Sequence, residues 1–120
     1  MRPTEINLHK KSRVLELAYE DGTRHQLTCE YLRVNSPSAE VRGHGPGEEK
    51  LQLGKEDVEI TDIVPVGNYA IQLVFDDTHD SGIYDWGLLR ELGDTYEDNW
   101  NAYLQRLKEE GYTRKANKLS

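Results

Sequence analysis

The chain has 120 residues, which is the usual size of one domain, and 22 acidic against 15 basic residues give it a formal net charge of −7. Nucleic acids and anionic membrane surfaces require a basic face, so this charge argues against both as partners. The single cysteine, Cys29, excludes an internal disulfide and a multi-cysteine metal site. No apolar run approaches the roughly 20 residues that cross a bilayer, and the N-terminus lacks a signal peptide's apolar stretch. We therefore predict a cytoplasmic protein.

The first part of the chain predicts a β-hairpin. Residues 1–12 are polar and are expected to lead into the fold. Residues 13–19 alternate, and Leu15, Leu17 and Tyr19 fall on one face. Asp21-Gly22 is a turn signal because glycine tolerates a positive φ, so residues 24–28 are expected to form the returning strand.

A short helical turn and a loop are predicted next. Residues 30–34 favour one helical turn, and Pro37 in the segment 35–38 stops it because proline disfavours a helical conformation in the preceding residue. Residues 43–50 have the composition of a loop. This glycine-rich segment is not a phosphate cradle, since it lacks the Gly-Lys-Ser/Thr ending and no buried strand leads straight into a helix there.

The strongest strand pattern lies between residues 58 and 84. Residues 58–66 are rich in β-branched side chains, Gly67-Asn68 makes a turn, and apolar residues alternate through 69–75. An acidic turn over residues 76–82 then precedes a short last strand at Ile83-Tyr84. Because no long helix separates these strands, the pairing is expected to be antiparallel.

The C-terminal part predicts two helices. Asp85 is expected to cap a short helix that Gly93 ends, and residues 94–97 approach a capping box with Asp in the Ser/Thr position. The second helix ends at Gly111, and the basic tail, residues 114–120, is expected to fray. An apolar stripe on the second helix is expected to pack on the sheet; it consists of Tyr96, Trp100, Tyr103, Leu104 and Leu107. Hairpins followed by helices predict a single α+β domain with an antiparallel sheet.

The acidic turn is the first candidate site. Asp76, Asp77, His79 and Asp80 place three carboxylates and one imidazole within five positions, and these donors suit Zn, Fe or Mn. In an extended segment Asp77 and His79 would point the same way and share an ion. The alternative is a solvated hairpin turn, because turns prefer Asp and Gly.

Two further site types follow from the sequence. Cys29, His44 and His79 would need an aspartate and tetrahedral geometry to form a mixed metal site, but their spacing matches no compact metal motif. A buried structural cysteine is the alternative for Cys29. A nucleophilic triad is not predicted, because the serines lack a nucleophile-elbow context; they are Ser36, Ser38 and Ser81.

Three segments together resemble a known family. They are LRVNSPSAEVRGH at residues 32–44, VGNYAI at 66–71 and FDDTHDSGIYDW at 75–86. This pattern is similar to the gamma-butyrobetaine hydroxylase-like N-terminal domain family, and its Gly-Ile-Tyr-x-Trp ending is the most specific part. The resemblance covers about residues 6–110, so it implies one such domain over residues 1–120.

The resemblance also carries expectations about metals. In the carnitine-pathway hydroxylases this domain precedes an iron and 2-oxoglutarate dioxygenase and binds a structural zinc through three cysteines and one histidine. Other members are fused to P-loop ATPases of the iron–sulfur carrier type. The cysteine positions fall here on Ser36, Ser38 and Val41, and only the histidine is kept, as His79. Serine and valine do not replace thiolates as zinc ligands, so the resemblance argues against the structural zinc.

These observations predict a non-enzymatic binding or adaptor module without a cofactor. It would serve a separately encoded metalloenzyme or an iron–sulfur carrier ATPase through a protein contact. The predicted contact surface comprises Arg33, Arg42, His44, His79 and Trp86. Two alternatives stay open: weak binding of iron or zinc through His79 and Asp77, with His44 or Cys29, and a non-catalytic subunit of an oxidoreductase.

Overall fold

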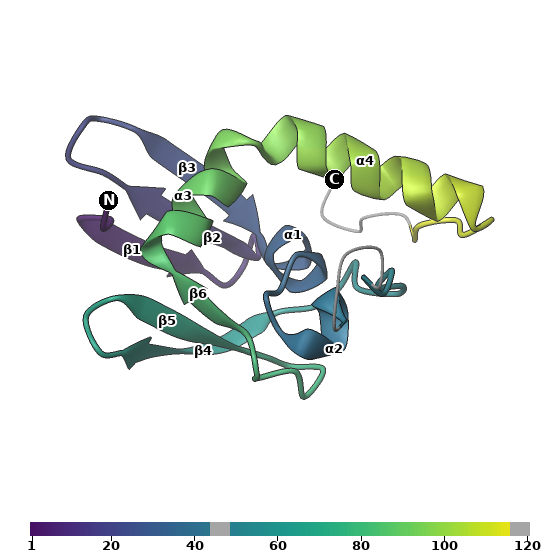
Figure 1. Cartoon of the computed structure of the whole chain (residues 1–120), viewed down its shortest axis with the longest axis horizontal. Helices are drawn as coiled ribbons and strands as arrows, with labels where there is room; N and C mark the ends of the chain where they lie inside the picture. The colour runs from purple at the N-terminus through teal and green to yellow at the C-terminus, as the bar shows by residue number, and fades with distance from the viewer. Residues whose placement is uncertain (44–48, 116–120) are drawn as a thin grey trace.

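Two three-stranded antiparallel sheets and four helices make up the part of the chain that the computed structural model describes, residues 1–43 and 49–115 (Figure 1). The first sheet contains β1 (Glu5–His9), β2 (Val14–Ala18) and β3 (Arg24–Thr28), and the second contains β4 (Ile60–Val66), β5 (Ala70–Phe75) and β6 (Ile83–Asp85). The helices are α1 (Cys29–Val34), α2 (Ala39–Arg42), α3 (Trp86–Asp94) and α4 (Tyr96–Glu109). The predicted α+β class is confirmed, with two sheets in place of the single sheet expected.

The first sheet contains the predicted hairpin and one strand that was not predicted. β2 and β3 pair around a turn in which Gly22 has a φ of 86°. The expectation that residues 1–12 only lead into the fold is wrong, because β1 pairs with β2 and places Ile6 opposite Leu17. Leu15 and Leu17 are fully buried, as their alternation predicted.

The second sheet follows the predicted strand pattern closely. β4 and β5 form a hairpin around Gly67, whose φ is 53°, and β6 pairs with the other side of β5. The register shifts between Ile60 and Asp62, which marks a β-bulge in β4. β4 also contains Pro65, and a proline, which has no N–H, is accommodated in a strand at the edge of a sheet.

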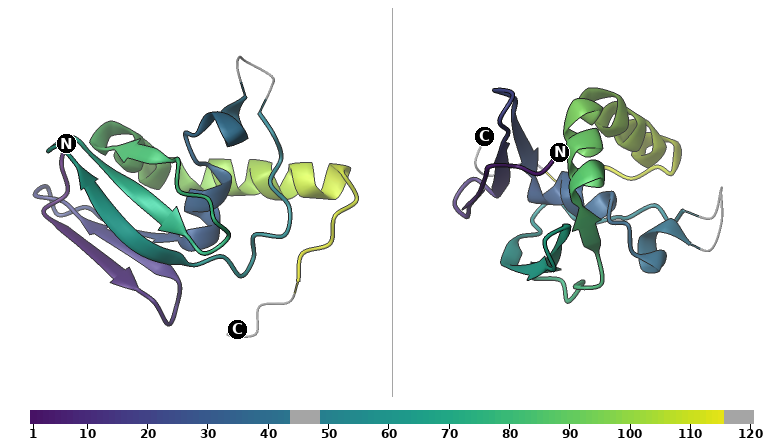
Figure 2. Two further views of the ribbon diagram at one scale, coloured as in Figure 1. Left: turned by 90° about the horizontal axis from the view of Figure 1, so that it is seen from below. Right: turned by 60° about the vertical axis from the view of Figure 1, so that its left-hand side comes forward.

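Helix α1 lies between the two sheets and α4, and its buried residues Cys29, Tyr31 and Leu32 belong to one core with both sheets (Figure 2). Tyr31 of α1 is fully buried and its hydroxyl donates to the carbonyl oxygen of Leu92 at 2.6 Å. Tyr84 of β6 is equally buried and donates to the carbonyl oxygen of Leu32 at 2.6 Å. A buried hydroxyl needs such a partner, so these two bonds specify how α1 sits against α3 and β6.

The start of α3 was predicted correctly, but its end was not. The Asp85 carboxylate accepts a hydrogen bond from the Leu88 N–H at 2.7 Å, which is the expected N-cap. Gly93 does not stop the helix, which continues through Asp94. The predicted capping box does not form either: α4 follows Thr95, whose side chain caps no N–H and instead donates to the carbonyl of Glu91.

Helix α4 buries Tyr103 and Leu107 of the predicted stripe and half-buries its other members, and the aromatic residues at its start pack on α1. The ring of Tyr31 lies 4.7 Å from that of Tyr96 and 6.3 Å from that of Trp100, centroid to centroid. The predicted fraying of the tail does not apply to Arg114, which pairs with Glu30 and lies 5.2 Å above the Trp100 ring. Residues 116–120 lie outside the described residues. Within the described segments, none of the helices has the length and apolar character needed to span a bilayer.

A candidate site around His79

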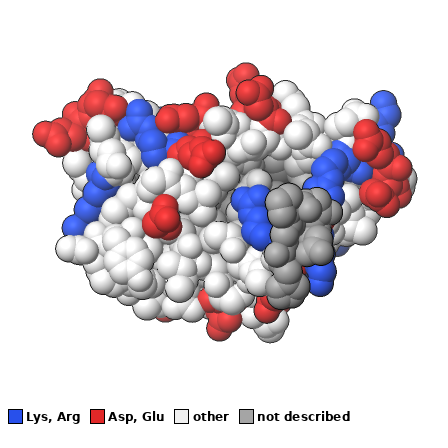
Figure 3. Space-filling view, viewed as in Figure 1, with Lys and Arg blue, Asp and Glu red and all other residues white. Residues whose placement is uncertain are grey.

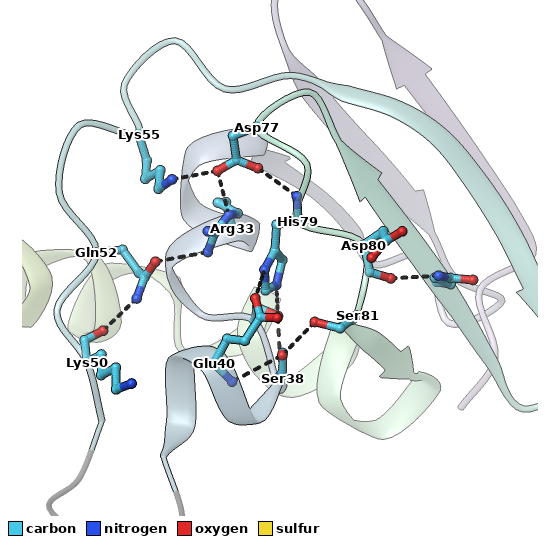
Figure 4. A network of polar contacts seen from close by, with 12 residues as sticks. Arg33, Ser38, Glu40, Lys50, Gln52, Lys55, Asp77, His79, Asp80 and Ser81 are labelled. Carbon is cyan, nitrogen blue, oxygen red and sulfur yellow. Dashed lines mark hydrogen bonds and ion pairs between the residues drawn. The ribbon is translucent and has the colours of Figure 1, made fainter.

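The connection between β5 and β6 lies against the corner between α1 and α2 (Figure 4). This segment is the acidic turn of the sequence, and Thr78 takes a left-handed conformation with a φ of 71° within it. The chain therefore reverses between Asp77 and His79, and their side chains diverge. The expectation that the two residues point the same way in an extended segment is wrong for this reason.

His79 is the centre of a buried hydrogen-bonded cluster. Its ring Nε2 lies 2.9 Å from Ser36 Oγ, and its Nδ1 lies 3.0 Å from Glu40 Oε2. The histidine side chain is 1% exposed, whereas that of Glu40 is 71% exposed. Next to them, the hydroxyl groups of Ser38 and Ser81 lie 2.7 Å apart. We call these five residues the His79 cluster.

The local sequence explains how the α1–α2 corner presents these groups. Ser38 is the N-cap of α2, and its hydroxyl accepts a hydrogen bond from the Glu40 N–H at 3.3 Å. Ser36 Oγ in turn accepts from the Ser38 N–H at 3.3 Å. Short polar side chains on both sides of Pro37 thus satisfy the backbone of the corner, and α2 brings Glu40 to the imidazole.

The order Ser36–His79–Glu40 has the connectivity of a hydrolase triad, which the sequence did not predict. A nucleophilic serine requires space for a substrate carbonyl about 3 Å from its oxygen. Ser36 is 0% exposed, and a Cβ added to Gly82 would lie only 2.5 Å from Ser36 Oγ. The backbone of the β5–β6 connection therefore covers the hydroxyl, and this arrangement leaves no space for a substrate there.

Asp77 belongs to a second network beside the cluster. Its Oδ2 accepts hydrogen bonds from Arg33 Nε at 2.9 Å and Lys55 Nζ at 2.6 Å, and its Oδ1 accepts from the His79 N–H at 3.2 Å. Burial alone raises the pKa of Asp77, but hydrogen bonds and charge from Lys55, the His79 amide and Arg33 outweigh it and hold the pKa below its usual value. This carboxylate therefore serves to join three segments of the chain.

The residues at the family's zinc positions do not fit a zinc ion. Ser36 is bonded to His79, Ser38 to Ser81, and Val41 is a buried apolar residue. Neutral hydroxyl groups and a valine side chain are not zinc ligands. Across residues 1–43 and 49–115, no three His, Cys, Asp or Glu side chains are grouped so that they could hold a metal ion.

The other predicted metal ligands lie elsewhere. Cys29 begins α1, is 1% exposed and packs in the core, and burial raises the pKa of its thiol. A hollow beside it is lined by Arg13 and Glu59 but not by His79. His44 lies outside the described residues. The structure thus agrees with the structural-cysteine alternative for Cys29.

The predicted contact surface is wrong in two of its members. Arg33 and His79 are 6% and 3% exposed and are bonded within the protein, so neither presents a surface to a partner. Arg42 is exposed. Trp86 is half-buried, donates its indole N–H to the carbonyl of Asn68 at 2.8 Å, and has the Arg2 guanidinium 5.6 Å above its ring.

We expect Asp77→Asn to lower the free energy of unfolding by about 1 kcal/mol at neutral pH, because a partly screened ion pair of this kind contributes about that much. The folded-state pKa of Asp77 is depressed, so its contribution is present above the unfolded pKa of about 3.9 and is lost as the pH falls through the folded value. Urea unfolding of both proteins at pH 7 and pH 3 measures this. An equal difference in stability at the two pH values would contradict it.

Comparison with known proteins places the chain in a family. The family model described as gamma-butyrobetaine hydroxylase-like, N-terminal, matches residues 6–90. No curated protein matches the chain.

Three solved structures are similar over most of the chain. A protein solved by NMR in solution is 47% identical, with a TM-score of 0.79, over 94% of this chain and 84% of that one. A second solution structure is 41% identical, with a TM-score of 0.83, over 99% and 95%. A crystal structure of a protein of unknown function from Acidithiobacillus ferrooxidans, of the DUF971 family, is 41% identical, with a TM-score of 0.65, over 77% and 92%. The chain belongs to the gamma-butyrobetaine hydroxylase-like, N-terminal family.

Proposed function

We propose that this protein is a non-enzymatic binding or adaptor module. The observation that carries the proposal is a row of side chains on the outer face of the second sheet, in which the exposed apolar residues Val64 and Ile83 flank the polar Gln72. It contrasts with the His79 cluster, in which Ser36 and His79 are buried and bonded to one another. Buried side chains that bond to one another support a structural role, whereas exposed apolar side chains on a sheet face support a contact with another protein.

The outer face of the β4–β5–β6 sheet contains this row. Val64, Gln72 and Ile83 are direct cross-strand partners, so their side chains lie side by side on one face. Val64 is 38% and Ile83 48% exposed. We define Val64, Gln72 and Ile83 as the outer sheet patch.

The family resemblance supplies two classes of partner for the outer sheet patch. One is a separately encoded iron and 2-oxoglutarate dioxygenase, and the other is a P-loop ATPase of the iron–sulfur carrier type. In other family members the domain is covalently joined to such proteins. A domain that is covalently joined to such a protein and a domain that binds it as a separate chain can use the same kind of contact. We therefore propose that this chain binds a dioxygenase or a carrier ATPase non-covalently.

Ile83→Glu is expected to weaken binding of the partner at least about tenfold, because it buries a charge in an apolar contact. Leu53→Glu is the matched control, since Leu53 is also 48% exposed but lies outside the sheet. Titration calorimetry of the purified chain with the dioxygenase or carrier ATPase encoded in the same genome measures the effect. Thermal unfolding shows that both variants are folded.

Several outcomes would contradict the proposal. Equal binding by Ile83→Glu and wild type would exclude the outer sheet patch. Failure of the wild type to bind either class of partner would exclude the adaptor role as stated. Turnover of a substrate by the purified chain alone would show that the protein is an enzyme.

A further inference from the structure

A hollow of about 170 Å³ lies between the α1–α2 corner, the segment 49–52 and α4. Val34 and Asn35 contribute one wall and Asn99 and Ala102 of α4 contribute another. The hollow is on the α2–α4 side of the molecule, away from the outer sheet patch at β4–β6 (Figure 1). Residues distant in the sequence therefore converge on a space that none of the contacts described above fills.

Among the described residues, the hollow is lined by three cationic side chains, Arg42, Lys50 and Arg106, against one acidic side chain, Glu49. This excess contrasts with the net charge of −7 of the chain, whose charged side chains on one face are seen in Figure 3. In the described segments none of these three cations forms an ion pair. Most other arginines there are each paired with a carboxylate, namely Arg13, Arg24, Arg33, Arg90 and Arg114.

The walls of the hollow are held in place by hydrogen bonds of the folded chain. Tyr103 is 8% exposed, and its hydroxyl donates to the carbonyl oxygen of Gln52 at 2.6 Å, which joins α4 to the segment 49–52. The Lys50 N–H donates to the carbonyl oxygen of Val41 at 2.7 Å, which joins that segment to α2. Arg42 Nη2 donates to the carbonyl of Asn35 at 3.2 Å, so part of its guanidinium is oriented and the rest remains available.

We propose that this hollow binds a small organic anion, a carboxylate or phosphate monoester with a short apolar body. Guanidinium groups bind carboxylates and phosphates through charge-assisted, paired hydrogen bonds. Val41, Leu51 and Tyr103 supply apolar surface for the body of the ligand. A volume of about 170 Å³ accommodates a small molecule and is below that of a drug-sized ligand site. The site is independent of the adaptor role proposed above.

Titration of the ¹⁵N-labelled chain, followed by amide chemical shifts, tests the proposal with three probes. Succinate represents a carboxylate ligand, inorganic phosphate represents a phosphate ligand, and succinamide is an uncharged analogue of succinate. We expect saturable shifts with at least one of the two anions, confined to amides of residues 34–42, 49–52 and 99–106. Succinamide is expected to cause no saturable shifts. Whichever anion binds more tightly identifies the head group.

The double variant Arg42→Gln/Arg106→Gln is expected to bind the anion at least about tenfold more weakly, because it removes two cationic side chains that can donate charge-assisted hydrogen bonds to the ligand. The double variant Lys11→Gln/Lys108→Gln is the matched control, since it also removes two positive charges, at exposed residues that do not line the hollow. Unchanged shifts in both sheets show that the variants are folded. Absence of saturable shifts with both anions, or equal affinity in the double variant, would overturn the proposal.

Discussion

His79→Ala is expected to lower the free energy of unfolding by about 3 kcal/mol, the cost of deleting a buried side chain together with its hydrogen bonds. The imidazole is 1% exposed and joins Ser36 to Glu40. Its loss leaves a cavity beside a buried hydroxyl and releases the β5–β6 connection from the α1–α2 corner. Urea denaturation at pH 7, monitored by tryptophan fluorescence and circular dichroism, measures the change.

His9→Ala is the control for this experiment. His9 is 49% exposed and bonds Glu16 at the surface, so its replacement is expected to change stability by less than about 0.5 kcal/mol. Ser36→Ala is expected to fall between the two, at about 1–2 kcal/mol, since it leaves one ring nitrogen without its partner. If His79→Ala lowered the free energy of unfolding no more than His9→Ala, the His79 cluster would not be what holds the β5–β6 connection to the α1–α2 corner.

The chelator EDTA gives an independent test of the same cluster. Because hydroxyl groups and a valine occupy the family's thiolate positions, the wild-type unfolding midpoint is expected to be the same with and without EDTA. A structural zinc contributes directly to folding, so its removal would lower the midpoint sharply. A fall on adding EDTA would show that a metal ion stabilises this chain after all.

Gly93→Ala is expected to lower the free energy of unfolding by about 2–3 kcal/mol, which is the upper range for overpacking. An added Cβ would overlap the ring of His25 on β3, lying 2.5 Å from its Cγ. The ring would have to move, breaking its 2.9 Å contact with Asp94 and its edge contact with Tyr19. Thermal and urea unfolding of the variant measure the loss.

Gly87→Ala on the same helix provides the matched control. A Cβ at Gly87 meets only Asp85 Oδ1, at the ordinary distance of 3.5 Å. Alanine is the better helix former by up to about 1 kcal/mol, so this change is expected to be neutral or stabilising. Adding His25→Ala to Gly93→Ala is expected to recover part of the loss. Equal effects of the two glycine substitutions would contradict a packing role for Gly93.

The strands and helices were predictable where several side chains repeat with one period. β2, β5 and α4 each bury such a series, whereas β1 offers only Ile6 and Leu8 between polar residues and was missed. Periodicity identified the buried face of α4 but not what it meets, because Tyr31, with which it packs, sits in a six-residue helix. The division of the strands into two sheets was not predicted either, because it depends on packing between segments that are distant in the sequence.

The candidate site was predictable only in part. The family pattern associated Ser36 and His79, which the structure places 2.9 Å apart. Glu40 was missed because its link to His79 spans 39 residues and nothing in the local sequence indicates it. The predicted contact surface includes Arg33, but the ion pair with Asp77, which lies 44 residues away in the sequence, allows its burial.

Pro65 and the bulge in β4 restrict how any partner can use the second sheet. Growth of a sheet by adding a foreign strand needs a regular row of N–H and C=O groups along an edge. On β4 that row is interrupted by the register shift near Ile60 and by the missing N–H of Pro65. The opposite edge, β6, is only three residues long. Self-templated aggregation through these edges is therefore discouraged, and recognition has to rely on side-chain chemistry, which permits more selectivity than backbone pairing.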